Sequence, residues 1–330
     1  MKALYGFSPD LPPFRDKTTT QQVTLLRSWG ADAIFGGYAD PAFVDAIHDH
    51  GMKIYAEFGC FRGKEWWEEV PESRPIQADD SPLEPVEWYY GVNPSVPTVR
   101  EQLLERLATL LQAHELDGLW LDFIRWPCRW ESPAPRLPQT SFDAATVARF
   151  TAENDIDENA FRDWQNDPAG ALHDYAQQWT QWRIDQVTTW VAEARAIVND
   201  VRPSAQLGLF AIPWQQSDFG GAIHTIIGQD FAALAPYIDI FSPMTYHLMC
   251  GQPVPWIANI ASEVAELTGK PVWPVIQSVD HPTTLSNTAY TTALETASST
   301  TDGVIVFTLA GVIEGERIAA TQQMWRGDAG

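Results

Sequence analysis

The most informative stretch of this chain reads LDGLWLDFIRWP and covers residues 116–127. Its continuous apolar run is typical of a strand buried on both faces of a parallel sheet. The run ends at Asp122, and a carboxylate at the end of a buried strand is costly unless a function or an ion pair accounts for it. Barrel enzymes place their catalytic groups at such strand ends, so we expect Asp122 to be closest to the chemistry. A structural ion pair between Asp122 and Arg125 is the alternative.

Similar runs recur along the chain, separated by amphipathic segments with apolar residues at helical spacing. Strands are expected over residues 3–7, 31–35, 53–58, 118–123, 206–212, 238–245, 272–277 and 303–309. Helices are expected over residues 20–29, 42–50, 99–114, 176–199, 231–235, 256–268 and 286–298. This alternation predicts an α/β fold, a (β/α)8 TIM barrel that forms a single domain over residues 1–330.

Two of the predicted connections are too long to be plain loops. They run from residue 60 to about residue 97 and from residue 127 to about residue 171, and both are rich in Pro, Trp and acidic residues. They follow strands 3 and 4 at the end of the barrel where binding loops lie. We therefore expect these long loops after strands 3 and 4 to form the walls of a substrate site.

The excess of acidic residues restricts the kinds of molecule that the protein is expected to bind. The formal charge of −22 would repel phosphate backbones and anionic membranes, so neutral ligands fit better than nucleic acid. No apolar run reaches the length of a membrane span, and the N-terminal residues show no signal-peptide pattern. We expect a cytoplasmic protein, or a secreted one if a leader has been removed. The oligomeric state is not predicted.

Tryptophan is abundant, with fifteen residues in the chain. Aromatic faces pack on the apolar C–H faces of sugar rings, although tryptophan is also a common core residue. Several of these residues lie beside Pro or Gly in predicted loops, namely Trp66, Trp67, Trp88, Trp126, Trp130, Trp214 and Trp256. Their number is compatible with either a carbohydrate site or an aromatic core.

The motifs between residues 93 and 309 resemble, in order and spacing, those of the glycosyl-hydrolase-like 10 family. In that family strand 4 reads roughly Asp-Gly-Ile-His-Phe-Asp-Asp-Tyr-Arg-Tyr-Pro, and Asp117, Gly118, Asp122, Arg125 and Pro127 match it. The other matching positions are Asn93-Pro94, Val99-Arg100, Trp182-Arg183, Asn199, Arg202-Pro203, Gly208, Asp239, Pro243, Tyr246, Pro271, Gln277 and Gly303-Val304.

The resemblance implies a (β/α)8 hydrolase that acts on carbohydrate, with the strand-4 acid Asp122 at the catalytic position. Two residues depart from the pattern, because Trp120 stands where the family commonly has His and Phe123 where it has a second acid. A weaker similarity to chitinase-like barrels covers Asp117-Gly118 and residues 242–246. There Ile124 replaces the essential Glu, and a hydrocarbon cannot protonate a leaving group.

Glycoside hydrolysis needs a second carboxyl group across the scissile bond. Glu57 lies near the end of strand 3 in the apolar setting YAEFG, where burial would raise its pKa and suit it to be a general acid. Asp280 follows strand 7, across the mouth from strand 4, and Asp218 follows strand 5. We rank Glu57 first, Asp280 second and Asp218 third. The predicted activity is a glycoside hydrolase that cleaves an oligo- or polysaccharide.

Residues at the strand ends are expected to contact the sugar. Tyr246 and Gln277 can hydrogen-bond to its hydroxyl groups, and His247 beside Tyr246 is a further contact. The other predicted contacts are Arg125, Trp120, Trp126 and Trp214. No cofactor and no metal ion are expected.

Two other classes of function stay open. A catalytically silent carbohydrate-binding barrel would keep an aromatic mouth and lack the second carboxylate. A metal-dependent hydrolase would use Asp122, histidines and the cysteines Cys60, Cys128 and Cys250, which follow strands 3, 4 and 6. Three Cys with His247 could bind zinc, Cys60 and Cys128 could form a disulfide, and three free thiols is the default.

Overall fold

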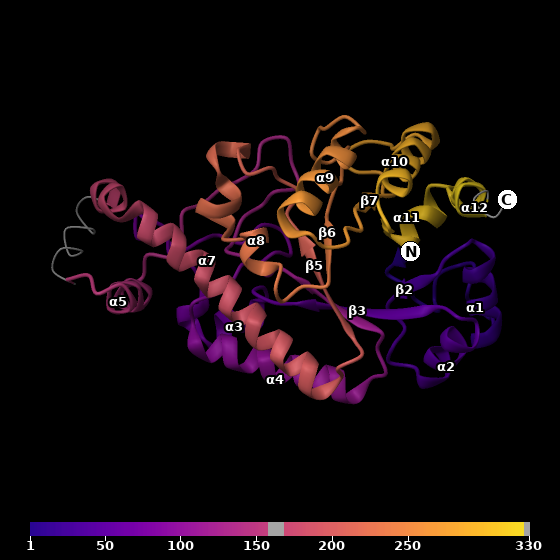
Figure 1. Cartoon of the computed structure of the whole chain (residues 1–330), viewed down its shortest axis with the longest axis horizontal. Helices are drawn as coiled ribbons and strands as arrows, with labels where there is room; N and C mark the ends of the chain where they lie inside the picture. Colours follow the sequence, from indigo (N-terminus) through magenta and orange to yellow (C-terminus); the bar gives the residue numbers. More distant parts are fainter. Residues whose placement is uncertain (158–167, 327–330) are drawn as a thin grey trace.

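The computed structural model describes residues 1–157 and 168–326. Within them, eight parallel strands form a sheet of order β6-β5-β4-β3-β2-β1-β8-β7. A parallel bridge between Phe241 and Val272 joins the two outer strands, so the sheet is a nearly closed barrel (Figure 1). The strands are β1 (Lys2–Tyr5), β2 (Ala33–Phe35), β3 (Lys53–Gly59), β4 (Gly118–Asp122), β5 (Gln206–Ala211), β6 (Ile240–Pro243), β7 (Val275–Gln277) and β8 (Val304–Phe307).

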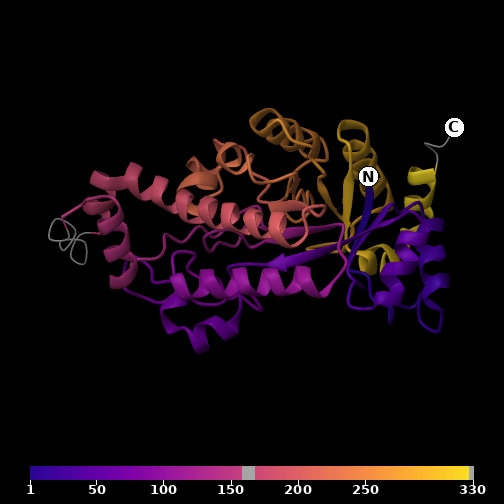
Figure 2. The ribbon, with the colours of Figure 1, turned by 60° about the horizontal axis from the view of Figure 1, so that its bottom comes forward.

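Helices lie between the strands, which confirms the predicted (β/α)8 barrel (Figure 1). The helices are α1 (Thr19–Ser28), α2 (Pro41–Asp49), α3 (Lys64–Glu69), η1 (Pro71–Ser73), α4 (Pro97–Ala113), α5 (Ala144–Glu153), α7 (Pro168–Val201), η3 (Asp218–Gly220), η4 (Ile223–Ile227), α8 (Phe231–Leu234), α9 (Trp256–Thr268), α10 (Asn287–Thr300), α11 (Leu309–Glu314) and α12 (Ile318–Arg326). The long helix α7 lies beside α4 on the outside of the barrel (Figure 2). Among the described helices, none has both the length and the apolarity needed to span a membrane.

The eight predicted strands are present, and all except β3 are shorter than predicted. The strand whose start shifts most is β7, predicted from residue 272 and observed from Val275. Pro274 has no N–H to donate, which explains why regular pairing begins after it. The two long connections contain helices that the sequence did not predict, α3 and η1 in the first and α5 in the second. Residues 158–167 of the second connection lie outside the described residues.

Large aromatic rings fill the barrel, and small residues make room for them. The Trp120 ring extends from β4 across the neighbouring β5, and its Nε1 donates a 2.9 Å hydrogen bond to Oγ of Ser242 on β6. Gly208 of β5 is paired with Trp120, and a Cβ atom there would lie 2.1 Å from the indole ring. Trp120 also stacks on Trp273 at 5.5 Å between ring centroids. This aromatic layer closes the barrel beneath its mouth.

The opposite end of the barrel is held by polar contacts at the amino ends of the strands. Asp117, just before β4, accepts hydrogen bonds from the Lys53 side chain at 2.7 Å and the Ile54 amide at 2.9 Å. Asp239, just before β6, accepts from Arg195 at 2.7 Å and from the Leu207 amide at 2.8 Å. These two carboxylates of the sequence pattern therefore stabilise the face remote from the candidate site.

Candidate active site

The structure brings Glu57 and Asp122 together at the mouth of the barrel. Glu57 lies on β3 and Asp122 ends β4, and the two strands are paired with Glu57 opposite Trp120 and Gly59 opposite Asp122. Side chains two residues apart share one face of a strand. Asp122 therefore points to the barrel interior above the Trp120 ring, and Glu57 points inward from the neighbouring strand.

Tyr5, at the end of β1, is a third member of the site. Its hydroxyl donates a hydrogen bond to Oε2 of Glu57. Burial, and then the charge of Glu57, raises the pKa of Tyr5 well above its usual value. The phenol therefore stays protonated and holds the Glu57 carboxylate in place. Sequence reasoning missed Tyr5, although a hydroxyl-bearing residue at the carboxyl end of a predicted strand was a signal for it.

The Asp122 carboxyl group has an unusual proton affinity. Burial, followed by the negative charge of Glu57, raises its pKa to about 8. A hydrogen bond from the Phe123 amide at 2.7 Å and the charges of Arg125 and Arg62 oppose this increase without cancelling it. At neutral pH, Asp122 therefore carries a proton that it can donate.

The backbone turns sharply directly after Asp122. Phe123 has a φ of +53°, a left-handed conformation that costs a non-glycine residue of order 1–3 kcal/mol. The turn directs the Phe123 amide back to the Asp122 carboxyl group, and the Phe123 ring stacks on Tyr89 at 5.6 Å between centroids. The guanidinium carbon of Arg62 lies 4.9 Å from the centroid of the same ring. The residue that replaces the family's second acid thus shapes the site.

A cavity of about 200 Å³, here called the mouth cavity, is lined by Phe123, the residue directly after Asp122, but not by Asp122 or Glu57 themselves. It is lined by residues that follow four of the strands, including Phe123 and Arg125 after β4, Tyr246 after β6, His281 after β7 and Phe307 on β8. Phe307 is also in ring contact with Tyr5 at 5.1 Å, which places the cavity next to the hydroxyl that binds Glu57. The cavity therefore occupies the carboxyl end of the barrel.

Two further cavities adjoin the mouth cavity. The wall cavity, about 470 Å³, lies between the two long connections and shares Tyr89 and Arg129 with the mouth cavity. The side cavity, about 300 Å³, shares Arg129, Glu131 and His281 with it. The three cavities form one groove, bordered by the indole of Trp88, which is 62% exposed. This agrees with the expectation that the long connections form the walls.

Comparison with known proteins gives the class of fold. No family model matches the sequence, and no curated protein is found to be similar to it. Solved structures do match. The PgaB (BpsB) glycoside hydrolase domain from Bordetella bronchiseptica superposes with a TM-score of 0.71 at 13% identity, over 98% of each chain.

Two β-galactosidases are also similar. The enzyme from Marinomonas ef1 gives a TM-score of 0.70 at 11% identity, over 98% of this chain and 59% of the other. That from Halorubrum lacusprofundi gives 0.69 at 11% identity, over 99% and 58%. This chain therefore shares the (β/α)8 barrel fold of these proteins. At such identities the similarity establishes the fold alone, and the chain spans well under two thirds of these β-galactosidases. Membership of the glycosyl-hydrolase-like 10 family stays a prediction.

Two of the predicted sugar contacts, Arg125 and Tyr246, line the mouth cavity of the barrel. The Tyr246 ring stacks between Trp130 and Phe307, with centroids 5.5 and 5.0 Å away. Arg125 donates from Nη1 to the Tyr89 hydroxyl at 3.1 Å and to the Cys128 carbonyl at 3.0 Å. Among the described residues Arg125 forms no ion pair with Asp122, so the structural alternative for Asp122 does not hold.

Three other predicted contacts are corrected by the structure, because their side chains are fully enclosed. Trp120 forms the layer beneath the site, as described above. Trp126 turns away from the mouth, and its Nε1 donates to the Arg183 carbonyl at 3.0 Å. The Gln277 amide donates to the carbonyls of Val279 and His281, at 2.8 and 2.6 Å, so it fixes the loop after β7.

Trp214 and His247 are nearly buried and line none of the three cavities. Trp214 packs against Phe219, with ring centroids 4.8 Å apart. Burial lowers the pKa of His247, so its ring is neutral at neutral pH. The position of neither ring therefore supports the predicted contact with the sugar.

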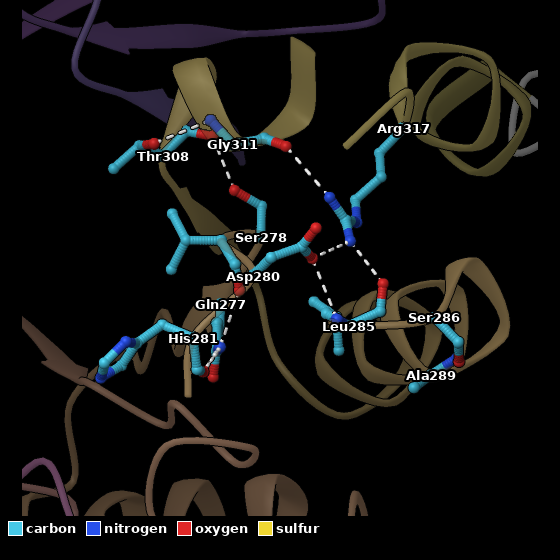
Figure 3. Close-up of polar contacts among 11 residues, drawn as sticks. Gln277, Ser278, Asp280, His281, Leu285, Ser286, Ala289, Thr308, Gly311 and Arg317 are labelled. Carbon is cyan, nitrogen blue, oxygen red and sulfur yellow. Dashed lines mark hydrogen bonds and ion pairs between the residues drawn. The ribbon is translucent and has the colours of Figure 1, made fainter. Parts of the chain in front are cut away.

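Asp280, the second candidate for the partner carboxylate, is engaged elsewhere. Its Oδ1 accepts from Arg317 at 2.6 Å and from the Leu285 amide at 2.9 Å (Figure 3). These contacts hold its pKa below the usual range. Figure 3 shows the carboxylate turned toward Arg317, on the other side of the loop from the His281 ring. Asp218 likewise stabilises a local turn, because its carboxylate accepts a hydrogen bond from the Gln215 amide at 2.9 Å.

The Asp280→Asn variant tests this correction. We expect hydrolytic activity per folded molecule to stay within about twofold of wild type, because the carboxylate does not reach the site. The stability should fall by about 1–3 kcal/mol, since the buried Arg317 guanidinium loses its anionic partner. Chemical unfolding and specific activity measure the two effects, and a large loss of activity without loss of stability would restore Asp280 as a catalytic candidate.

Sequence reasoning also missed Glu131 and Arg62. Glu131 lines both the mouth cavity and the side cavity, and among the described residues no ion pair engages it. Arg62 is near enough to lower the pKa of Asp122. Both belong to the long connections, where charged residues are usually solvated, so the sequence offered no signal that distinguishes them from other loop residues.

The cysteines contribute no disulfide. Cys60, Cys128 and Cys250 are buried and free. Burial, the largest cause, raises the pKa of all three thiols, so they are protonated at neutral pH. Over residues 1–157 and 168–326, no group of three His, Cys, Asp or Glu side chains is arranged to hold a metal ion.

Proposed function

We propose that this protein is a glycoside hydrolase that cleaves an oligo- or polysaccharide, with Asp122 as general acid and Glu57 as its partner. The observation that carries the proposal is the pair of inward-facing carboxyl groups at the barrel mouth, of which burial and the neighbouring charge keep Asp122 protonated. Two carboxyl groups in different protonation states are what glycoside hydrolysis uses. The fold shared with glycoside hydrolase barrels supports the same class.

The arrangement distributes the chemical roles as follows. Asp122 protonates the glycosidic oxygen as the bond to the leaving group breaks. The Glu57 carboxylate, oriented by the Tyr5 hydroxyl, acts on the anomeric carbon, directly as nucleophile or through a water molecule that it deprotonates. This reverses the sequence-based assignment, in which Glu57 was the acid. The reason is that burial and the charge of Glu57 raise the pKa of Asp122.

The environment of the site suits a sugar. Aromatic rings of Phe123, Tyr246, Phe307 and Trp88 border the mouth cavity and offer faces for the apolar side of a pyranose. The aromatic layer around Trp120 closes the bottom of the barrel, and the groove offers substrate a route from the opposite side. Removal of water around the scissile bond strengthens the interaction between the carboxyl groups and the reacting atoms.

A glycan panel tests the proposal. Wild-type protein is incubated with neutral and anionic polysaccharides, and new reducing ends are measured. The blank is the double variant Glu57→Gln/Asp122→Asn, which keeps the shape of the site and lacks both carboxyl groups. We expect release of reducing ends by the wild type alone. Binding without release by either protein would overturn the proposal in favour of a silent carbohydrate-binding barrel.

A further inference from the structure

Arg125 is a buried cation that forms no ion pair within the described residues, although the charges of Glu131 and Asp122 are near enough to favour its own. Its side chain is 3% exposed, and within the described part of the chain no carboxylate lies at ion-pair distance from it. Its hydrogen bonds run from Nη1 to the neutral acceptors Tyr89, Trp126 and Cys128. Nε is enclosed without a partner, whereas Nη2 is not enclosed and donates to no described acceptor.

A buried charge without a partner is destabilising, so its presence needs an explanation. The chain holds 43 acidic and 21 basic residues, and a carboxylate could readily have been placed beside this guanidinium. Glu131 and Asp122 are near enough to favour the charge of Arg125, but neither forms an ion pair with it and Asp122 carries a proton at neutral pH. Arg125 lines the mouth cavity, so a negative group of the substrate can supply the missing partner.

A second pair of arginines lies farther along the groove. Arg129 and Arg136 face each other across an antiparallel bridge, with backbone hydrogen bonds of 3.2 and 2.8 Å. Like charges at directly opposed positions are destabilising. Glu87 pairs with Arg129 at 3.2 Å, while none of the described acids forms an ion pair with Arg136. Both arginines line the wall cavity and the side cavity.

The remaining charged groups of the groove do not offset these arginines. Glu84 of the wall cavity pairs with Arg74 at 3.2 Å. Glu131 lines the mouth cavity and contacts neither Arg125 nor Arg129 at ion-pair distance. The other titratable residues on the mouth cavity wall are Glu87, which pairs with Arg129, and Tyr89, Cys128, Tyr246 and His281. Within the described residues, the groove of this very acidic protein therefore presents two guanidinium groups, those of Arg125 and Arg136, that form no ion pair with a carboxylate.

We propose that the groove recognises an anionic glycan. A carboxylate or sulfate group on the sugar in the mouth cavity binds Nη2 of Arg125, and further units of the chain place their negative groups beside Arg129 and Arg136. This inference rests on the proposed function and names its substrate class. The net charge of −22 does not prevent binding at physiological salt, where the screening length is about 8 Å and short contacts in the groove persist.

Matched pairs of glycans test the inference. The anionic probes are polygalacturonate, alginate, hyaluronan and λ-carrageenan, and each is compared with its carboxyl-reduced or desulfated form. Cleavage by wild type and binding to Asp122→Asn by calorimetry are both measured. We expect at least one anionic form to bind about 10–100-fold more tightly than its neutral form, the range for a hydrogen bond to a charged group. Sulfate-bearing and carboxylate-bearing probes distinguish the two possible negative groups.

Three variants in the Asp122→Asn background show which residues are responsible for the tighter binding of the anionic form. Arg125→Gln should lower the affinity for the anionic form by a much larger factor than the affinity for the neutral form. Arg136→Gln changes an exposed residue and carries little risk for folding. It should lower the affinity for the anionic form by a smaller factor than Arg125→Gln does. Arg27→Gln, whose partner Asp32 lies at the opposite end of the barrel, removes one positive charge as the control and should have no effect.

The outcomes separate the two proposals. Equal or better cleavage of the neutral forms would overturn the anionic substrate class and leave the hydrolase standing. A loss of affinity for neutral and anionic forms alike in Arg125→Gln would also overturn it. Failure to cleave any probe, neutral or anionic, would overturn the hydrolase, and failure to bind any anionic probe would overturn the substrate class.

Discussion

Replacing Asp122 with Asn should slow hydrolysis by about 10²–10⁴-fold, the contribution of a positioned general acid. The amide keeps the shape of the carboxyl group and cannot donate a proton to the leaving oxygen. Affinity for the glycan should change little, because the groove and its aromatic border are untouched. Turnover and calorimetric binding measure the two quantities, and Asp280→Asn is the matched control, since that carboxylate lies outside the site.

The role of Asp122 as general acid also determines how the rate and the stability depend on pH. Asp122 has a pKa of about 8 in the folded protein, so the wild-type rate should be sustained up to that pH and fall about tenfold per unit above it. The folded state also binds this proton more tightly than the unfolded state, whose carboxyl group titrates near 3.8. Wild type should therefore lose stability relative to Asp122→Asn as the pH rises from about 4 to 8. A rate that is flat through pH 9 would contradict the role of Asp122 as acid.

Gly208→Ala should be strongly destabilising. The new Cβ would lie 2.1 Å from the Trp120 ring, which cannot retreat because it stacks on Trp273 and donates to Ser242. Overpacking of a filled core costs about 1–3 kcal/mol and occasionally more. We expect a lower midpoint in chemical unfolding and a matching loss of activity, since the displaced indole lies directly beneath Asp122.

A double-variant cycle tests whether the clash with the Trp120 ring causes the destabilisation by Gly208→Ala. Trp120→Phe alone should destabilise, because it leaves a void and an unpaired Ser242 hydroxyl. Gly208→Ala added to Trp120→Phe should cost at least about 1 kcal/mol less than in the wild-type background, which is the coupling expected of residues in contact. Strict additivity of the two changes would show that Gly208 is required for another reason.

The sequence predicted the barrel and part of its site because both depend on local patterns. Apolar runs between amphipathic segments mark strands that are buried on both faces, and this gave all eight strands. Asp122 and Glu57 were identifiable because each is a carboxylate in an apolar run near a predicted strand end. That they lie on neighbouring strands followed directly from their order in the chain.

Other features depend on contacts between distant residues and could not be predicted in this way. Whether Trp120 faces a sugar or fills the core is decided by Gly208 and Ser242 on other strands. Asp280 was a plausible catalytic acid until its contact with Arg317, from a later helix boundary, became visible. The exchange of roles between Glu57 and Asp122 depends on the burial of Asp122 and on its closeness to the charge of Glu57, which no local pattern reports.

The residues proposed to bind the glycan and the residues proposed to react with it belong to different parts of the fold, the two long connections and the strands. Arg129, Arg136 and Trp88 belong to these connections, whereas Tyr5, Glu57 and Asp122 belong to hydrogen-bonded strands. Segments of this kind tolerate replacement far better than the strands they join. Natural divergence or directed evolution can therefore retarget the groove to other polymers by grafting new connections, while the reacting groups keep their inherited geometry.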